Sequence, residues 1–257
     1  MIGLTHAQSV ELRPRFLPDR PGPLIGLHWI ETGHGTGWVD RWPRPRAILV
    51  ETAGNYSLSG DPEAIQPDNL RPLIKGFVEA PGVFVPLLSE AFPGLSVWER
   101  VIFELLQEAR FELPAGFDIR RLDADDGPVL ARLSLESAWI SKTWEGGPSM
   151  AASGYSCGVF TGGRLVAVAN TFFVGDRYED LGVVTEPEFR GCGLGMACAG
   201  LVCAEVLNRG RIPSWTTSPD NVGSIRVAEK LGFTLNRRDV LYAVGVAVPE
   251  PPRPPSA

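Results

Sequence analysis

The stretch with the clearest chemical potential is RGCGLG, residues 190–195, which directly precedes an apolar run of mostly small residues. Its glycines leave main-chain N–H groups uncovered, and Arg190 adds a fixed positive charge beside them. The first N–H groups of a helix have no partner within the helix, and the helix dipole favours negative charge at this end. A glycine-rich turn that opens a helix therefore predicts a site for a pyrophosphate.

Two well-known phosphate loops do not fit this stretch. A Walker loop ends in Gly-Lys-Ser/Thr to reach the phosphates and Mg²⁺, whereas Met196 and Ala197 follow Gly195 here. A Rossmann loop belongs to a first βαβ unit and has another glycine spacing, whereas this loop follows an expected antiparallel hairpin. The loop by itself supports an anion site and an ordinary strand-to-helix turn equally.

Carboxylates are the candidate proton acceptors near this loop. His6, His28 and His34 all lie at the N-terminal end of the chain, so the second half has no histidine for a nucleophile–histidine pair. Glu179 and Asp180 begin the segment YEDLGVVT, which reads as a strand. Successive strand residues face opposite sides, so only one of the two carboxylates can face a cleft, and the offset from Arg190 slightly favours Asp180. A solvated strand entry is the open alternative for both.

Charge and cysteine usage exclude several other classes. The net charge of −6 and the pI near 5.2 argue against electrostatic binding of nucleic acid. The cysteines lack CxxC spacing and nearby histidines, so we expect free thiols and no metal site; they are Cys157, Cys192, Cys198 and Cys203. No run approaches the roughly 20 apolar residues of a membrane helix, and no secretory leader is evident, so we expect a cytoplasmic protein without a membrane partner.

The chain divides near Pro114. Residues 1–113 are rich in proline and glycine, with a strand expected in 47–60 and a helix in 96–111. Residues 249–257 are proline-rich and predict a disordered tail.

The second half has a regular order of elements. The patterns predict strands at 117–122, 155–160, 164–174, 178–185, 212–218 and 238–248, and helices at 123–139, 194–210 and 221–233. A TGG turn joins 155–160 and 164–174 into a hairpin.

Three of these segments, in this order, resemble the GNAT superfamily of N-acetyltransferases. VVTEPEFRGCGLG resembles its acyl-CoA signature, SPDNVGSIRVAEKLGF its fourth helix, and FDIRRLDADDGPVLARL its first strand and helix. The resemblance covers roughly residues 116–246. The N-terminal stretch GWVDRWPRPRAILVETAGNYSLSGDP, residues 37–62, is similar to a bacterial subgroup that carries an extra N-terminal domain, here residues 1–113. The resemblance implies an α+β fold, in which helices flank a mixed, mostly antiparallel sheet with splayed strands, plus an N-terminal α/β domain. Whether that domain is a degenerate GNAT half stays open.

The resemblance also implies acetyl-CoA as the acyl donor. Its pantetheine arm would bind the main chain of Val183, Val184 and Thr185, and the N–H of Val184 would polarise the thioester. The pyrophosphate would bind Arg190, Gly191, Cys192, Gly193, Leu194 and Gly195. Asn221 resembles an asparagine that contacts the pantetheine.

The implied reaction is direct attack of a primary amine on acetyl-CoA in a ternary complex. Asp180 or Glu179 would be the general base. The superfamily's usual acid, a tyrosine, is replaced by Ala228, which leaves Ser224 and Tyr242 as candidate acids. Ser224 has the open alternative of capping the preceding helical turn.

The acceptor is a small molecule or a peptide, and the sequence does not specify it further. Trp139 and Trp144 lie where acceptor-binding helices are expected, and they either line an apolar pocket or fill the core. A catalytically silent acyl-CoA sensor or interaction module is the alternative function. The oligomeric state is not determined by the sequence.

Overall fold

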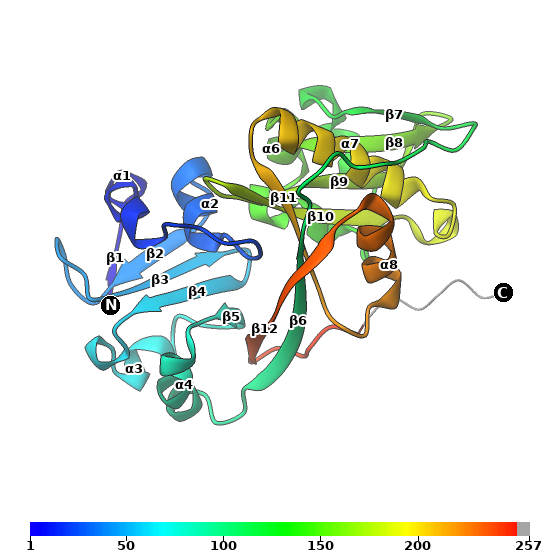
Figure 1. Ribbon diagram of the computed structural model, residues 1–257. Helices are drawn as coiled ribbons and strands as arrows, with labels where there is room; N and C mark the ends of the chain where they lie inside the picture. The colour runs from blue at the N-terminus through cyan, green and yellow to red at the C-terminus, as the bar shows by residue number, and fades with distance from the viewer. Residues whose placement is uncertain (251–257) are drawn as a thin grey trace. The chain divides into compact units, whose positions relative to one another are not determined.

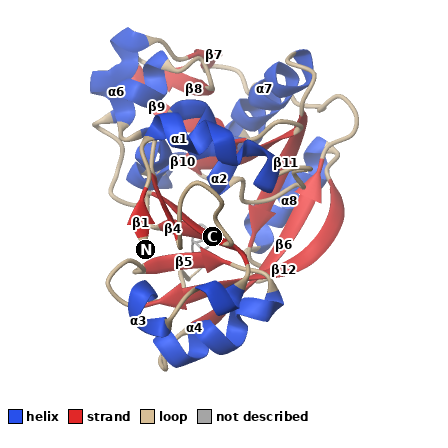
Figure 2. Cartoon of the chain, turned by 90° about the vertical axis from the view of Figure 1, so that its left-hand side faces the viewer, coloured by secondary structure: helices blue, strands red, loops and turns tan. Residues whose placement is uncertain are grey.

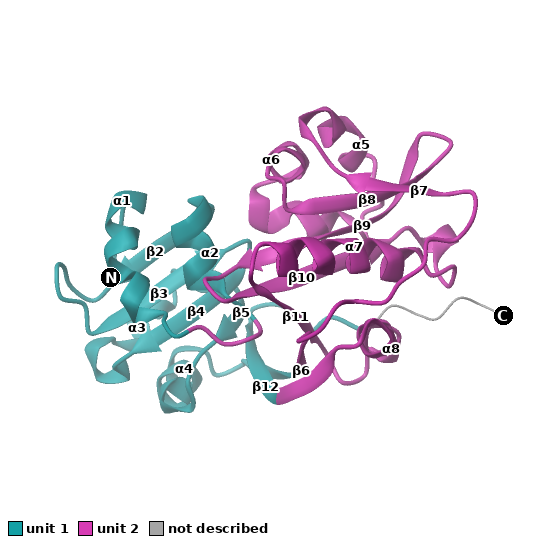
Figure 3. Ribbon diagram, turned by 45° about the horizontal axis from the view of Figure 1, so that its top comes forward, with its two compact units in different colours: residues 1–18, 23–100, 238–250 teal, residues 19–22, 101–237, 251–257 magenta. Residues whose placement is uncertain are grey.

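The computed structural model describes residues 1–250, and the chain forms two compact units (Figure 3). Unit 1 contains residues 1–18, 23–100 and 238–250, and unit 2 contains residues 19–22 and 101–237. The division therefore does not fall at Pro114, because residues 101–113 belong to unit 2 and the end of the last strand belongs to unit 1. The expected disordered tail, 249–257, lies almost entirely outside the described residues.

Unit 1 is built on a mixed sheet in the order β1-β2-β3-β4-β5-β12. The strands are β1 (Ile2–Gly3), β2 (Thr36–Val39), β3 (Ala47–Thr52), β4 (Asn55–Gly60), β5 (Gly76–Glu79) and the end of β12 (Thr234–Val244). All the neighbouring pairs are antiparallel except β4 and β5, which are parallel. Helices α1 (His6–Ser9), α2 (Ile25–Thr32), α3 (Pro67–Leu70) and α4 (Val85–Ala91) complete the unit. Helix α2 packs on β3 and β4, and α3 packs beside α4 (Figure 2).

The segment 47–60, expected as one strand, is a hairpin. Ala53 and Gly54 have φ angles of 53° and 76°, and they separate β3 from β4. Such a pair of left-handed residues suits a two-residue turn between antiparallel strands. The hairpin supplies buried residues to the unit 1 core, among them Leu49 and Leu58.

The strands of unit 2 lie in the order β6-β11-β10-β9-β8-β7 (Figure 1). The strands are the end of β6 (Ser96–Glu104), β11 (Ile212–Thr217), β10 (Tyr178–Thr185), β9 (Arg164–Val174), β8 (Ser156–Thr161) and β7 (Asp118–Arg121). Only β10 and β11 are parallel. The α+β class predicted from the sequence is confirmed.

Helices cover both faces of the unit 2 sheet. On one face, α7 (Leu194–Asn208) packs on β8, β9 and β10, with α8 (Val222–Leu231) beside it. The short helices α5 (Gly127–Leu130), η5 (Ala138–Trp144) and α6 (Gly147–Ala152) pack on the other face. Side chains of β10 point to both layers in turn. Leu181 packs with residues of α7, whereas Val184 packs with residues of α5, η5 and α6 on the other face.

Two helix predictions are wrong. Residues 96–111 form strand β6, followed by coil, because Val101, Ile102 and Phe103 are buried in a ladder with β11. Residues 123–139 break into η4 (Ala124–Asp126), α5 and coil, with Pro128 in the first turn of α5.

Other predictions for this half of the chain agree with the structure within a few residues. They are the strands at 155–160, 164–174, 178–185 and 212–218 and the helices at 194–210 and 221–233. None of the helices among residues 1–250 is long and apolar enough to cross a membrane.

Candidate functional site

Strands β10 and β11 separate after a short stretch of parallel pairing. Residues 178–180 pair with 212–214, and beyond this point β10 pairs only with β9 while β11 pairs only with β6. A bulge lies at the point of separation, where Phe172 of β9 has no partner between Asp180 and Leu181. Because successive residues of a strand direct their main-chain groups to opposite edges, every second residue of 181–185 turns these groups away from β9.

The loop after β10 leads directly into α7. Gly191 and Gly193 have φ angles of 82° and 80°, which a residue with a side chain rarely adopts, and Gly193 is the N-cap of α7. No side chain of residues 1–250 caps this helix end. Residues 191–193 are exposed. The first-turn N–H groups of a helix that starts in this way are available to an anion.

Gly195 lets α7 approach the end of β10. A Cβ atom at this position would lie 2.8 Å from Oγ1 of Thr185 and 3.5 Å from Cγ1 of Val183. Because Gly195 has no side chain, the N-terminus of α7 can lie close to the segment 183–185. The residues fit a ligand that runs from the separated strands to the helix end.

The guanidinium of Arg190 contacts a main-chain carbonyl and an acidic side chain. Its Nε donates to the carbonyl of Thr185 at 3.2 Å, and its Nη2 lies 2.8 Å from Oε2 of Glu136. The Arg190 side chain is 26% exposed and that of Glu136 is 65% exposed. The expected positive charge is thus present beside the loop, but an acidic side chain already pairs with it.

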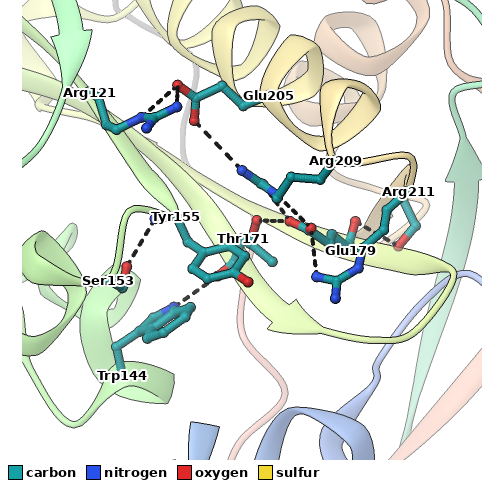
Figure 4. Close-up of polar contacts among 10 residues, drawn as sticks. Arg121, Trp144, Ser153, Tyr155, Thr171, Glu179, Glu205, Arg209 and Arg211 are labelled. Carbon is teal, nitrogen blue, oxygen red and sulfur yellow. Dashed lines mark hydrogen bonds and ion pairs between the residues drawn. The ribbon is translucent and has the colours of Figure 1, made fainter. Parts of the chain in front are cut away.

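Glu179 lies in an ion-pair cluster (Figure 4). Its fully buried carboxylate accepts hydrogen bonds from Arg209 at 2.9 and 2.8 Å and from Arg211 at 3.1 Å. The hydroxyl of Thr171 donates to the same carboxylate. Arg209 also lies 4.7 Å from the ring centroid of Tyr155. Two arginines therefore hold this carboxylate in place.

Asp180 faces the opposite side of β10. It is 5% exposed, and its Oδ1 accepts hydrogen bonds from Ser214 Oγ at 2.8 Å and Thr216 Oγ1 at 2.9 Å. Both hydroxyls belong to β11, whose Ser214 pairs with Asp180 in register. The structure therefore brings Asp180 to the point where β10 and β11 separate.

Asn221 and Ser224 lie together at the start of α8. Asn221 is the N-cap residue, and its Oδ1 accepts from the N–H of Ser224 at 3.2 Å. The indole of Trp215 donates to Oγ of Ser224 at 2.9 Å. The hydrogen of the Ser224 hydroxyl therefore points away from the indole. Ala228 is fully buried in the same helix.

Tyr242 lies in the core of unit 1. Tyr242 belongs to unit 1, where it is 8% exposed, pairs with Val78 of β5 and packs in the unit 1 core.

The two tryptophans differ in their surroundings. Trp144 is 4% exposed, donates its indole N–H to the carbonyl of Thr171 at 2.8 Å and stacks on Tyr155. These contacts are those of a core residue. Trp139 is 38% exposed, and its ring lies edge-on to Phe172 at a centroid distance of 5.4 Å.

The cysteines are free thiols. Burial raises the pKa of Cys157 to about 12 and also raises the pKa of Cys198 and Cys203. Only Cys192, in the loop before α7, is exposed. The three buried thiols are therefore unreactive at neutral pH.

The sequence did not predict several contacts of the candidate site residues. Ser214 and Thr216 contact Asp180, Glu136 pairs with Arg190, and Arg209 and Arg211 pair with Glu179. Each of these pairs joins segments far apart in the chain. Only the alternation of β11 signalled that Ser214 and Thr216 share one face.

Solved structures show the class of protein to which this fold belongs. A GCN5-related N-acetyltransferase-like protein from Streptococcus suis has a TM-score of 0.68 and 20% identity, with coverage of 93% of this chain and 99% of that one. A tandem GNAT protein from the clavulanic acid biosynthesis pathway has a TM-score of 0.58 and 16% identity, with coverage of 96% and 99%. The fold is therefore the GNAT fold, as predicted.

The chain belongs to the GNAT acetyltransferase family, whose model matches residues 24–242. A relative from Streptomyces virginiae, described as an uncharacterised N-acetyltransferase in the mutA 5′ region, is 40% identical over 199 residues. The match spans 76% of this chain and 83% of that relative.

Proposed function

We propose that unit 2 binds acetyl-CoA and transfers its acetyl group to a primary amine by direct attack in a ternary complex. The observation that carries this proposal is the helix end of α7, which no side chain caps and which follows directly on the strand that separates from β11. Membership of the GNAT acetyltransferase family supports the same chemistry.

The main chain would hold most of the donor. The N–H groups of residues 191–195 and the guanidinium of Arg190 would bind the pyrophosphate, and residues 183–185 would bind the pantetheine arm. Cys192 and Leu194 contribute only main-chain groups. Asn221 uses Oδ1 to cap α8, so its amide nitrogen is the group that would reach the donor. When bound, acetyl-CoA supplies an activated thioester that the N–H of Val184 would polarise.

Asp180 is the better candidate for the general base. Two arginines neutralise Glu179, whereas Asp180 lies on the opposite face with the hydroxyls of Ser214 and Thr216. Asp180 would accept a proton from the substrate ammonium, which leaves a neutral amine whose lone pair can attack the thioester carbonyl. The two hydroxyls would hold the carboxylate in one orientation.

Ser224 is the remaining candidate for the general acid. Its hydroxyl is oriented by the Trp215 indole, and Tyr242 packs in the core of the other unit. The lack of the usual tyrosine is the feature that favours the alternative function, a silent acyl-CoA sensor.

We also propose that unit 1 is a second GNAT-like half without a donor site. In unit 1, β2, β3 and β4 form an antiparallel meander, and β5 pairs in parallel with β4. Unit 2 has the same pattern, because β8, β9 and β10 form an antiparallel meander and β11 pairs in parallel with β10. The helix of unit 1 in the position of α7, however, is α3, which is 4 residues long, and the Gln66 and Asn69 side chains occupy its N-terminus.

The direct test measures thiol release from acetyl-CoA over a panel of amines, for the wild type and for Asp180→Asn. We expect amine-dependent release in the wild type and a loss of at least about 100-fold in kcat for the variant, with acetyl-CoA affinity retained. Acetyl-CoA binding without release for any amine would favour the sensor. Full activity in Asp180→Asn would exclude Asp180 as the base.

A further inference from the structure

Glu136 holds the only arginine of the RGCGLG loop. The Arg190 guanidinium lies 2.8 Å from the Glu136 carboxylate, and its Nε is bound to the Thr185 carbonyl. A guanidinium paired with a carboxylate attracts a second anion less strongly, because the pair has no net charge. Glu136 therefore opposes anion binding at the site where the pyrophosphate is proposed to bind.

Ser134 anchors the segment that carries Glu136. The neighbouring Ser134 donates its N–H to both carboxylate oxygens of Glu186, at 3.3 and 3.2 Å, and its hydroxyl to Oε1 at 3.0 Å. Glu186 follows β10 directly and is 4% exposed. The segment 134–139 is thus attached near the end of β10 at two points, a half-buried one through Ser134 and an exposed one through Glu136.

Segment 134–139 also extends to the point where β10 and β11 separate. It carries Leu135, which is 97% exposed, and Trp139, whose ring contacts Phe172. Phe172 is the bulged residue of β9, next to Phe173, the β9 partner of Asp180. One short segment therefore connects the loop arginine with the residues around the candidate base.

We propose that Glu136 competes with the acyl donor for Arg190, and that donor binding releases the exposed attachment of segment 134–139. This inference rests on the proposed function. The pyrophosphate offers Arg190 several oxygens and more than one negative charge, so it displaces the single carboxylate. The Ser134 attachment remains, so the segment loosens around Glu136 and Trp139 without leaving the strand end. Glu136 is thus a positioning residue that couples occupancy of the donor site to the mobility of the segment beside Asp180.

The test is a calorimetric double-mutant cycle with acetyl-CoA as the ligand. We expect Glu136→Gln to lower the Kd by about two- to five-fold, the range for a partly exposed ion pair. In an Arg190→Gln background, the same substitution should leave the Kd unchanged. Glu188→Gln is the matched control, because Glu188 lies before the same loop and is 52% exposed but pairs with Arg164. It should not change the Kd.

Hydrogen exchange of segment 134–139 supplies the second readout. We expect saturating coenzyme A to raise exchange there in the wild type, and Glu136→Gln to show raised exchange without ligand. Equal Kd values for wild type and Glu136→Gln, or equal tightening by Glu188→Gln, would overturn the inference while leaving the proposed function intact. A wild type that does not bind acetyl-CoA would instead refute the proposed function.

Discussion

At the scale of single residues, adjacent carboxylates on β10 have different environments. Glu179 is fully buried among two arginines and a threonine, and Asp180 meets two hydroxyls at the separation of the strands. Because successive side chains of a strand point to opposite faces, Glu179 has a structural role in an ion-pair cluster, whereas Asp180 is the candidate base.

Glu179→Gln should destabilise the protein without removing the candidate base. The substitution leaves Arg209 and Arg211 without their buried partner, so we expect the free energy of unfolding to fall by about 3 kcal/mol. Urea denaturation followed by circular dichroism measures this change. Asp180→Asn is the control, with an expected loss below about 1.5 kcal/mol. A larger loss in Asp180→Asn than in Glu179→Gln would contradict this assignment.

Cys192 should be the only thiol that reacts in the native protein. It is exposed, whereas burial raises the pKa of Cys157, Cys198 and Cys203. We expect iodoacetamide to modify Cys192 alone, and saturating coenzyme A to slow this modification, as peptide mass spectrometry can show. Modification of a buried cysteine at a similar rate would contradict the packing around α7.

Asp126 should make the stability depend on pH in the acid range. A hydrogen bond from Arg120 lowers the pKa of this carboxyl below its usual value. A lowered folded-state pKa gives a stabilisation that is present above the unfolded-state pKa, about 4, and is lost as the pH falls through the folded-state pKa. The difference in unfolding free energy between wild type and Asp126→Asn should therefore shrink below about pH 4. A difference that is constant from pH 7 to pH 3 would contradict this cause.

At the scale of elements, the site depends on the close approach of α7 to β10. Gly195→Ala places a Cβ atom 2.8 Å from Thr185 Oγ1, so the Thr185 side chain or the helix N-terminus must shift. We expect acetyl-CoA to bind at least about five-fold more weakly. Adding Thr185→Ala removes the clashing hydroxyl and should restore most of the affinity in titration calorimetry. Unchanged affinity in Gly195→Ala would show that this spacing does not matter.

Local patterns predicted the elements around the loop, and long-range contacts determined the rest. Strand β10, the glycine turn and α7 are each specified by neighbouring residues, so their prediction was correct. Segment 96–111 was predicted as a helix because its strand partners at 214–217 are remote in the chain. The same distance hid the partners of Glu179, since Arg209 and Arg211 follow α7 whereas Glu179 begins β10.

At the scale of the whole molecule, two units share a strand pattern. Among residues 1–250, only unit 2 has a long helix with an uncapped N-terminus at the candidate donor site. We therefore expect one acetyl-CoA per chain. Gly193→Val introduces a side chain where φ is 80° and should remove all binding, without a residual weaker site. A second binding isotherm that survives in Gly193→Val would assign a donor site to unit 1.

Titration calorimetry of the full chain with acetyl-CoA tests the central claim most directly, with Arg190→Gln measured beside the wild type. The account predicts binding in the wild type, with a stoichiometry close to one, and a Kd about tenfold higher in Arg190→Gln. Absence of binding by the wild type at about 1 mM acetyl-CoA, a concentration that would reveal even a weak donor site, would contradict it.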